Sequence, residues 1–271
     1  MKTELKLKLI DYLSNFVTER KRSLIDQTLM ERTRHVCTVL ENIYQPHNAS
    51  AVIRSCECFG IQDIHIIEKE HAYRVNPDIV LGASKWINLK KYCHTDENNV
   101  ATCLTDLKND GYQIVATTLR DDSISIHELD LRQKIALCFG GEKPGLSEEV
   151  HAMADVWLTI PMWGFTQSLN ISVCAAICLF HLTHRLRNSD IDWHLTSDET
   201  IDLQIEWLTK TASHGARPLR GVPSPLPPIF FILSETHPPF EQTSDFAYIL
   251  VVSSCLQKAT SGSLLAPIIV K

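Results

Sequence analysis

The sequence predicts an α/β fold with a mostly parallel sheet flanked by helices. From about residue 36 onward, short segments rich in Ile, Val and Leu alternate with segments of helical periodicity, which is the pattern of βαβ units. Hydrophobic residues make up 44% of the 271 residues, enough to build a core and too many for a wholly disordered chain. The length suits one large domain or a domain with an appendage.

The catalytic domain is expected to span residues 36–188. Its strands are expected at CTVLENI, IHIIE, WINLKKY, YQIVATTL, KIALCFGG and DVWLTIPM, and its helices at 48–58, 97–108 and 169–185. In parallel sheets, ligands bind at the carboxyl ends of the strands. The loops of interest are therefore those that follow Ile43, Phe139 and Ile160.

Residues 1–35 are expected to form a basic helical extension. Residues 1–54 hold nine basic and six acidic side chains, a local charge of +3 in a chain whose net charge is −6. Such a zone permits contact with a nucleic acid. On charge alone, two solvated amphipathic helices are the simpler explanation.

The end of the chain has a different composition. Residues 189–211 are expected to form a C-terminal helix, with its helical pattern at 199–211. Residues 212–271 then contain eight of the twelve prolines and only seven charged side chains. This composition favours a Pro-rich, poorly ordered tail. A segment that binds a partner or touches a membrane is the less favoured alternative.

Nothing in the sequence indicates a membrane span, a secretory signal or a metal site. No apolar run reaches the roughly 18 residues that a span needs, and the first residues alternate charged and apolar side chains. The nine cysteines include no CxxC pair, and Cys174 and Cys178 are interpreted as small core residues. We expect a cytoplasmic protein of a reducing compartment, with no membrane contact and no metal.

The first loop, NIYQPHNASAVIRSCECFG, marks a turn from strand to helix. Asn48 is expected to cap the helix. Arg54 lies off the buried stripe of the helix. In one interpretation, it forms an ordinary ion pair with Glu57 on the protein surface. An Arg at the mouth of the sheet that meets a phosphate or a ribose oxygen is the other.

The second loop is LCFGGEKPGLSEE, in which two glycines end a strand and Ser147 caps the next helix. Gly140 and Gly141 allow a ligand to approach the backbone closely. A plain tight turn with a solvated Glu142 explains the same residues equally well.

The third loop, IPMWGFTQSLNISVCAAICLF, places polar side chains at the start of a very apolar helix. Backbone amides and small polar side chains at a helix start suit a polar ligand. As an ordinary helix start, Ser168 would be the cap and Asn170 a first-turn residue.

Together and in this order, the three loops resemble the motifs of the SpoU/TrmH family of SPOUT RNA ribose 2′-O-methyltransferases, from about Arg32 to Thr211. The resemblance implies a SPOUT fold with a C-terminal trefoil knot. It also implies S-adenosylmethionine as cofactor and a homodimer whose active site borrows residues across the interface.

The resemblance also assigns roles to residues. The implied catalytic set is Arg54, Asn48, Glu142, Ser168 and Asn170. The implied cofactor contacts are Thr117, Gly141, Ile160, Met162 and Leu169, and the candidate RNA contacts are Arg20, Lys21, Arg22, Arg32 and Arg34. The family gives Arg54 the role of activating the hydroxyl, although a guanidinium keeps its proton in proteins. Arg54 could instead orient the ribose and a phosphate.

The implied function is S-adenosylmethionine-dependent 2′-O-methylation of a ribose in tRNA, with guanosine 18 of the D-loop as the suggested target. Only about 35 residues precede the first strand, which favours the layout of the tRNA enzymes. Two alternatives stay open: methylation of rRNA or of another tRNA site, and a non-catalytic RNA-binding protein on the same fold.

Overall fold

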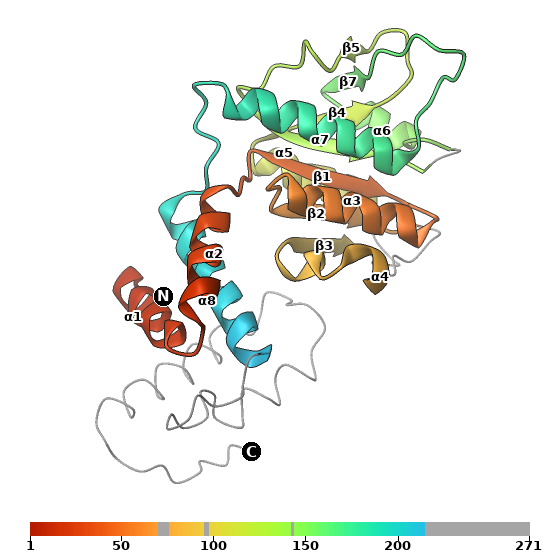
Figure 1. The fold of residues 1–271 in the computed structure, drawn as a ribbon. Helices are drawn as coiled ribbons and strands as arrows, with labels where there is room; N and C mark the ends of the chain where they lie inside the picture. Colours follow the sequence, from red (N-terminus) through yellow and green to blue (C-terminus); the bar gives the residue numbers. More distant parts are fainter. Residues whose placement is uncertain (70–75, 95–97, 142–143, 215–271) are drawn as a thin grey trace, which may run out of the picture. The chain divides into compact units, whose positions relative to one another are not determined.

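The computed structural model describes residues 1–69, 76–94, 98–141 and 144–214 (Figure 1). The chain divides into two compact units. The larger unit is Glu19–Trp207, and the described part of the smaller one combines Met1–Thr18 with Leu208–His214. The expected tail beyond residue 214 lies outside the described residues.

One parallel sheet forms the centre of the larger unit. Its strands are β1 (Val36–Glu41), β2 (Asp63–Ile67), β3 (Asn88–Tyr92), β4 (Tyr112–Thr117), β5 (Ile124–Ser125), β6 (Lys134–Phe139) and β7 (Val156–Thr159). Their order in the sheet is β3-β2-β1-β6-β4-β7-β5, and each pairing between them is parallel. The predicted α/β class and parallel sheet are therefore confirmed. The two-residue strand β5 was not predicted, because so short a segment has no periodicity to detect.

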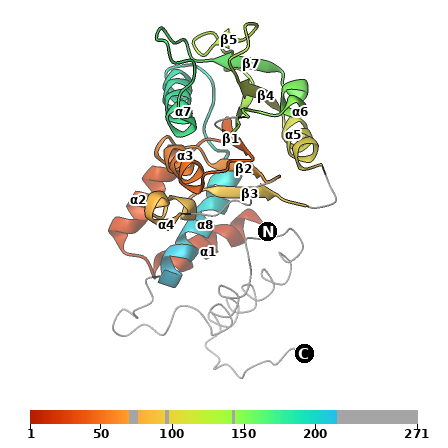
Figure 2. The same cartoon turned by 90° about the vertical axis from the view of Figure 1, so that its right-hand side faces the viewer.

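Helices cover both faces of this sheet. The helices of the chain are α1 (Thr3–Ser14), α2 (Glu19–Met30), α3 (Pro46–Cys58), α4 (Pro77–Val80), α5 (Asn99–Asn109), α6 (Glu148–Met153), α7 (Ile171–Arg187) and α8 (Ser197–His214), with a 3₁₀ turn at Ala83–Lys85. Helices α3 and α7 pack on one face, while α5 and α6 pack on the other (Figure 2). This arrangement explains why β1 is buried along its whole length, as a strand covered on both faces must be.

Two helix starts differ from the prediction, and both differences affect the site. Helix α3 begins at Pro46 with Gln45 as its cap, so Asn48 is not the cap. A proline fits the first helical position because its fixed φ suits a helix and its missing N–H would have no partner there. Helix α7 begins at Ile171 with Asn170 as its cap, and Ser168 lies outside the helix.

The first part of α8 belongs to the larger unit and packs close to α2 and the loop before β3. Trp207 is 2% exposed, and its ring meets Trp86 edge-on with centroids 5.5 Å apart. Gln204 also donates a hydrogen bond of 2.7 Å to Asp26. In the described part of the chain, no helix is long and apolar enough to cross a membrane.

Candidate active site

Four neighbouring strands bring the predicted loops to one edge of the sheet. In the order β1-β6-β4-β7, each strand is parallel to the next, so their carboxyl ends lie along the same edge. Leu40 pairs with Phe139, Ala116 with Cys138, and Thr117 with Leu158. The loops after β1, β6 and β7 therefore leave from neighbouring positions, as the sequence predicted.

The starts of α3 and α7 are joined by two asparagines of the predicted catalytic set. Asn170 Nδ2 donates to Asn48 Oδ1 at 3.3 Å, although the two residues are 122 positions apart. Asn48 is 6% exposed, and its own amide donates to Gln45 Oε1 at 3.1 Å. Asn170 Oδ1 accepts from the backbone N–H of Ser172 at 2.9 Å. These contacts fix both amides.

Arg54 projects from the exposed face of α3, six residues after Asn48. It makes no hydrogen bond or ion pair with another described residue. Glu57, the partner of the simple surface-pair interpretation, binds Arg32 Nη2 at 2.8 Å instead. That interpretation is therefore wrong, and the Arg54 guanidinium is available to a ligand.

The remaining members of the predicted catalytic set are placed differently. Ser168 lies in the exposed segment that precedes α7, where the neighbouring Trp163 and Phe165 are 92% and 107% exposed. Ser168 does not cap the helix, because Asn170 occupies that position. Glu142 lies outside the described residues. The structure thus brings Asn48 and Asn170 together, and among the described residues Ser168 forms no hydrogen bond with either of them.

The glycine loop after β6 closes on itself. A Cβ added at Gly140 would lie 2.1 Å from the backbone of Gly145, so only glycine fits there. Gly145 has a φ of +67°, and its N–H donates to the carbonyl of Gly141 at 2.9 Å. Gly140 thus serves loop closure rather than close approach by a ligand.

Of the predicted cofactor residues, Thr117, Gly141 and Ile160 lie at or directly after the ends of β4, β6 and β7, while Met162 and Leu169 lie further along the segment between β7 and α7. Thr117 ends β4 and donates to the carbonyl of Cys138 at 2.8 Å. Ile160 packs half-buried against the core, Met162 is half-buried, and Leu169 is 38% exposed. Backbone groups of a tight loop beside partly exposed apolar surface suit a ligand with an apolar ring and polar edges.

Two of the candidate RNA-binding arginines have structural roles instead. Arg32 is 1% exposed: it pairs with Glu57 and lies over the Trp207 ring, 5.1 Å from its centroid. Burial lowers the pKa of Arg32. Arg34 is held between Asp63 and Glu199, each at 2.9 Å; burial opposes its charge, but the two carboxylates prevail and raise its pKa. Neither guanidinium is presented to a phosphate.

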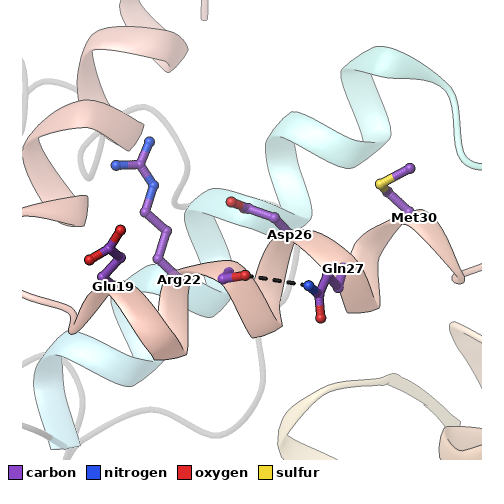
Figure 3. Close-up of a pocket in the computed structure, with 6 residues that line it drawn as sticks. Glu19, Arg22, Asp26, Gln27 and Met30 are labelled. Carbon is purple, nitrogen blue, oxygen red and sulfur yellow. Dashed lines mark hydrogen bonds between the residues drawn. The ribbon is translucent and has the colours of Figure 1, made fainter.

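The other three basic candidates, Arg20, Lys21 and Arg22, lie at the start of α2. Lys21 sits over the Trp86 ring, 4.9 Å from its centroid. Arg22 borders a hollow of about 410 Å³ along α2 (Figure 3). The hollow is lined by Glu19, Arg22, Ser23, Asp26, Gln27 and Met30. All of these come from a single helix and include two acids, so the hollow shows no enclosure for an anion.

The described cysteines and histidines give no sign of a metal centre. All eight cysteines of the described residues are free, and Cys178 is fully buried, as the interpretation as a core residue required. No group of three or more His, Cys, Asp or Glu side chains in the described part of the chain is arranged to hold a metal ion.

Sequence reasoning missed two features of this region. The first is Glu41, the last residue of β1, which is a carboxylate only 3% exposed. An acid at the end of a mostly apolar strand was a signal that could have found it. The second is an apolar stripe on α7, with Val173, Ile177 and Phe180 exposed by 47%, 39% and 58%. Their spacing of four and three residues places them on one side of the helix.

Comparison with known proteins agrees with this geometry. The model of the SpoU rRNA methylase family matches residues 35–180. The chain is 46% identical to the tRNA (guanosine(18)-2′-O)-methyltransferase of Borreliella burgdorferi over 201 residues, which cover 74% of this chain and 90% of that enzyme. The enzyme of the same name from Thermus thermophilus is 37% identical, over 60% of this chain and 81% of its own length.

A solved structure shows the same likeness. The crystal structure of the TrmH/SpoU tRNA-modifying enzyme of A. aeolicus superimposes with a TM-score of 0.62 at 28% identity. The match covers 74% of this chain and 98% of that one. The family model, the relatives and the fold all agree with the prediction from the three loop motifs: the chain belongs to the SpoU rRNA methylase family.

Proposed function

We propose that this protein transfers a methyl group from S-adenosylmethionine to the ribose 2′-hydroxyl of guanosine 18 in tRNA. The observation that carries the proposal is the Asn48–Asn170 contact, with Arg54, which has no partner among the described residues, on the same helix as Asn48. The choice of substrate is supported by the similarity to a tRNA (guanosine(18)-2′-O)-methyltransferase along 90% of that enzyme's length. Since the substrate is a tRNA, we place the activity in the cytoplasm.

The chain's own residues would bind and orient the ribose. The cofactor supplies an electrophilic methyl group, so the protein must hold the attacking oxygen in line with it. Arg54 offers a planar fork of donors to the ribose or to a neighbouring phosphate. Asn48 and Asn170, with fixed amides, would hold the sugar. Since a guanidinium keeps its proton, we assign Arg54 to orientation and not to proton removal. Glu142 and Ser168 remain predicted members of this set.

The cofactor would bind at the carboxyl ends of β6, β4 and β7. The residues there fit S-adenosylmethionine, because the tight glycine loop offers backbone groups while Ile160 and Leu169 offer apolar surface for an adenine ring. Thr117 ends β4 and Gly141 follows β6, and these two strands pair side by side. Met162 would complete the apolar side.

We also propose that the protein acts as a homodimer through the α7 stripe of Val173, Ile177 and Phe180. Solvent-exposed apolar side chains repeated along one helix face favour burial against a partner. The C-terminal trefoil knot remains a prediction that rests on the family resemblance. The division into an RNA-binding extension at 1–35, a catalytic domain at 36–188, a helix at 189–211 and a tail at 212–271 also remains a prediction. On the extension, Arg20, Lys21 and Arg22 are the remaining RNA contacts.

The proposal is tested by methyl transfer to unmodified RNA transcripts. Purified protein and labelled S-adenosylmethionine are incubated with tRNA and with rRNA, and the 2′-O-methylated nucleotide is then mapped. A tRNA transcript carrying 2′-deoxyguanosine at position 18 is the matched control, because it lacks only the attacking oxygen. We expect methylation of the tRNA at guanosine 18 and none of the control.

Each other outcome selects one of the alternatives. Methylation of rRNA, or of the control tRNA at another nucleotide, would identify the same chemistry at a different site. RNA binding without methyl transfer, in protein that binds no S-adenosylmethionine, would identify a binding protein on the same fold. We also expect no metal requirement, so EDTA should reduce activity only as far as it unfolds the RNA.

A further inference from the structure

Glu41 is a buried carboxylate at the edge of the sheet that carries the site. It ends β1 and is 3% exposed. Among the described residues, no Lys, Arg or His forms an ion pair with it. A buried polar side chain is costly unless hydrogen bonds compensate it, so the contacts of Glu41 indicate what it does.

The contact of Glu41 is with the glycine loop. Its Oε2 accepts a hydrogen bond of 2.8 Å from the backbone N–H of Ser147, 106 positions away in the sequence. Ser147 is also the cap of α6, where its hydroxyl accepts from the N–H of Val150 at 3.3 Å. One residue thus ends the loop, starts the helix and is bound to β1.

The same loop is closed tightly at its other end. Gly140 and Gly145 are in contact, and Gly145 N–H is bonded to the carbonyl of Gly141. A Cβ at Gly141 would lie 3.6 Å from the carbonyl oxygen of Asn42, the residue after Glu41. The loop therefore lies directly against the end of β1, and Glu41 is the side chain that fastens it there.

We infer that Glu41 is a positioning residue for methyl transfer, whose carboxylate holds the backbone at Gly145–Ser147 against the end of β1, in the position that binds the cofactor. The inference rests on the proposed function. It predicts that loss of the carboxylate loosens the loop and lowers the affinity for S-adenosylmethionine, while the affinity for RNA stays the same. A purely structural role would instead lower stability and leave the cofactor affinity unchanged.

The test compares Glu41→Ala, Glu41→Gln and Thr38→Val in the full chain. Glutamine keeps an oxygen that can accept from Ser147, whereas alanine leaves that N–H without a partner. Thr38 is the matched control because it lies on the same strand and is fully buried. Its hydroxyl contacts Cys56 and not the loop, so Thr38→Val perturbs the core of β1 alone.

Three measurements are made on each variant: thermal stability, the Kd for S-adenosylmethionine by calorimetry, and amide exchange at Ser147 and Gly145 without cofactor. For Glu41→Ala we expect Ser147 exchange and the Kd to rise about tenfold or more, the range for a buried N–H that loses its partner. Glu41→Gln should bring both the Ser147 exchange rate and the Kd most of the way back to the wild-type values. Thr38→Val should lower the melting temperature and leave the Ser147 exchange rate and the Kd unchanged. The KM for tRNA should stay near wild type throughout.

The inference is overturned if Glu41→Ala binds the cofactor as the wild type does, or if Thr38→Val weakens binding equally for the same loss of stability. If Glu41→Ala does not fold, Glu41→Asp replaces it, since the shorter side chain cannot span the same distance to Ser147. Wild-type protein that binds no S-adenosylmethionine would overturn the proposed function itself. Unchanged binding in the variants overturns only the role of Glu41.

Discussion

Replacing Arg54 with alanine separates catalysis from stability in this protein. Arg54 is exposed on α3 and forms no hydrogen bond or ion pair with another described residue. Removing it therefore breaks no contact that the described fold depends on. Arg32 provides the opposite case from a similar stretch of sequence, because it is 1% exposed and bound to Glu57 at 2.8 Å.

These environments set the expected magnitudes. A surface substitution without partners changes the free energy of unfolding by at most about 0.5 kcal/mol. Breaking a buried ion pair by removing one partner costs about 3–5 kcal/mol, and the 27% exposure of the Glu57 side chain places Arg32→Ala at the lower end. For catalysis, loss of the group that orients the ribose should lower turnover about a thousandfold, or about 4 kcal/mol of transition-state stabilisation.

The assay measures urea unfolding, cofactor binding and single-turnover methyl transfer for Arg54→Ala, Arg54→Lys and Arg32→Ala. Both Arg54 variants should unfold like the wild type, bind S-adenosylmethionine nearly as well and fail to methylate tRNA. Lysine should not rescue activity, since an ammonium cannot reproduce the planar fork. Turnover above a tenth of the wild type in Arg54→Ala would refute the assignment, and a destabilisation as large as that of Arg32→Ala would refute the description of Arg54 as unpaired.

Three further predictions concern association, pH and the tail. Ile177→Glu should give a folded monomer by analytical ultracentrifugation, because it puts a charge in the apolar stripe of α7; a dimer of unchanged affinity would exclude this interface. Burial lowers the pKa of His65 from 6.5 to about 4. Between pH 6.5 and pH 4, the His65 imidazole therefore gains a proton in the unfolded chain but not in the folded one. Stability should thus be full above pH 6.5 and fall toward pH 4 by at most about 3 kcal/mol, a loss that urea titrations should find reduced in His65→Gln. A chain that ends at His214 should methylate tRNA like the full chain, because the family match ends at residue 180. Loss of RNA affinity in the shortened chain would show that the tail contributes to RNA binding.

The sequence by itself determined the fold class, the family and the order of the loops. Apolar segments such as IHIIE and KIALCFGG are local signals, and they predicted strands that the structure places at Asp63–Ile67 and Lys134–Phe139. Motif spacing along the chain was enough to identify the family. Periodicity also placed Arg54 off the buried stripe of its helix, and this position is confirmed.

Only the tertiary structure decided which polar residues act together. Arg32 and Arg54 look alike in a sequence, and burial beside Glu57 makes the first structural while the second stays available. Likewise, Asn170 rather than Ser168 caps α7 and meets Asn48, a contact between residues 122 positions apart. The physical reason is that burial and hydrogen bonding between distant segments depend on how the strands are ordered in the sheet. No local pattern of residues encodes that order.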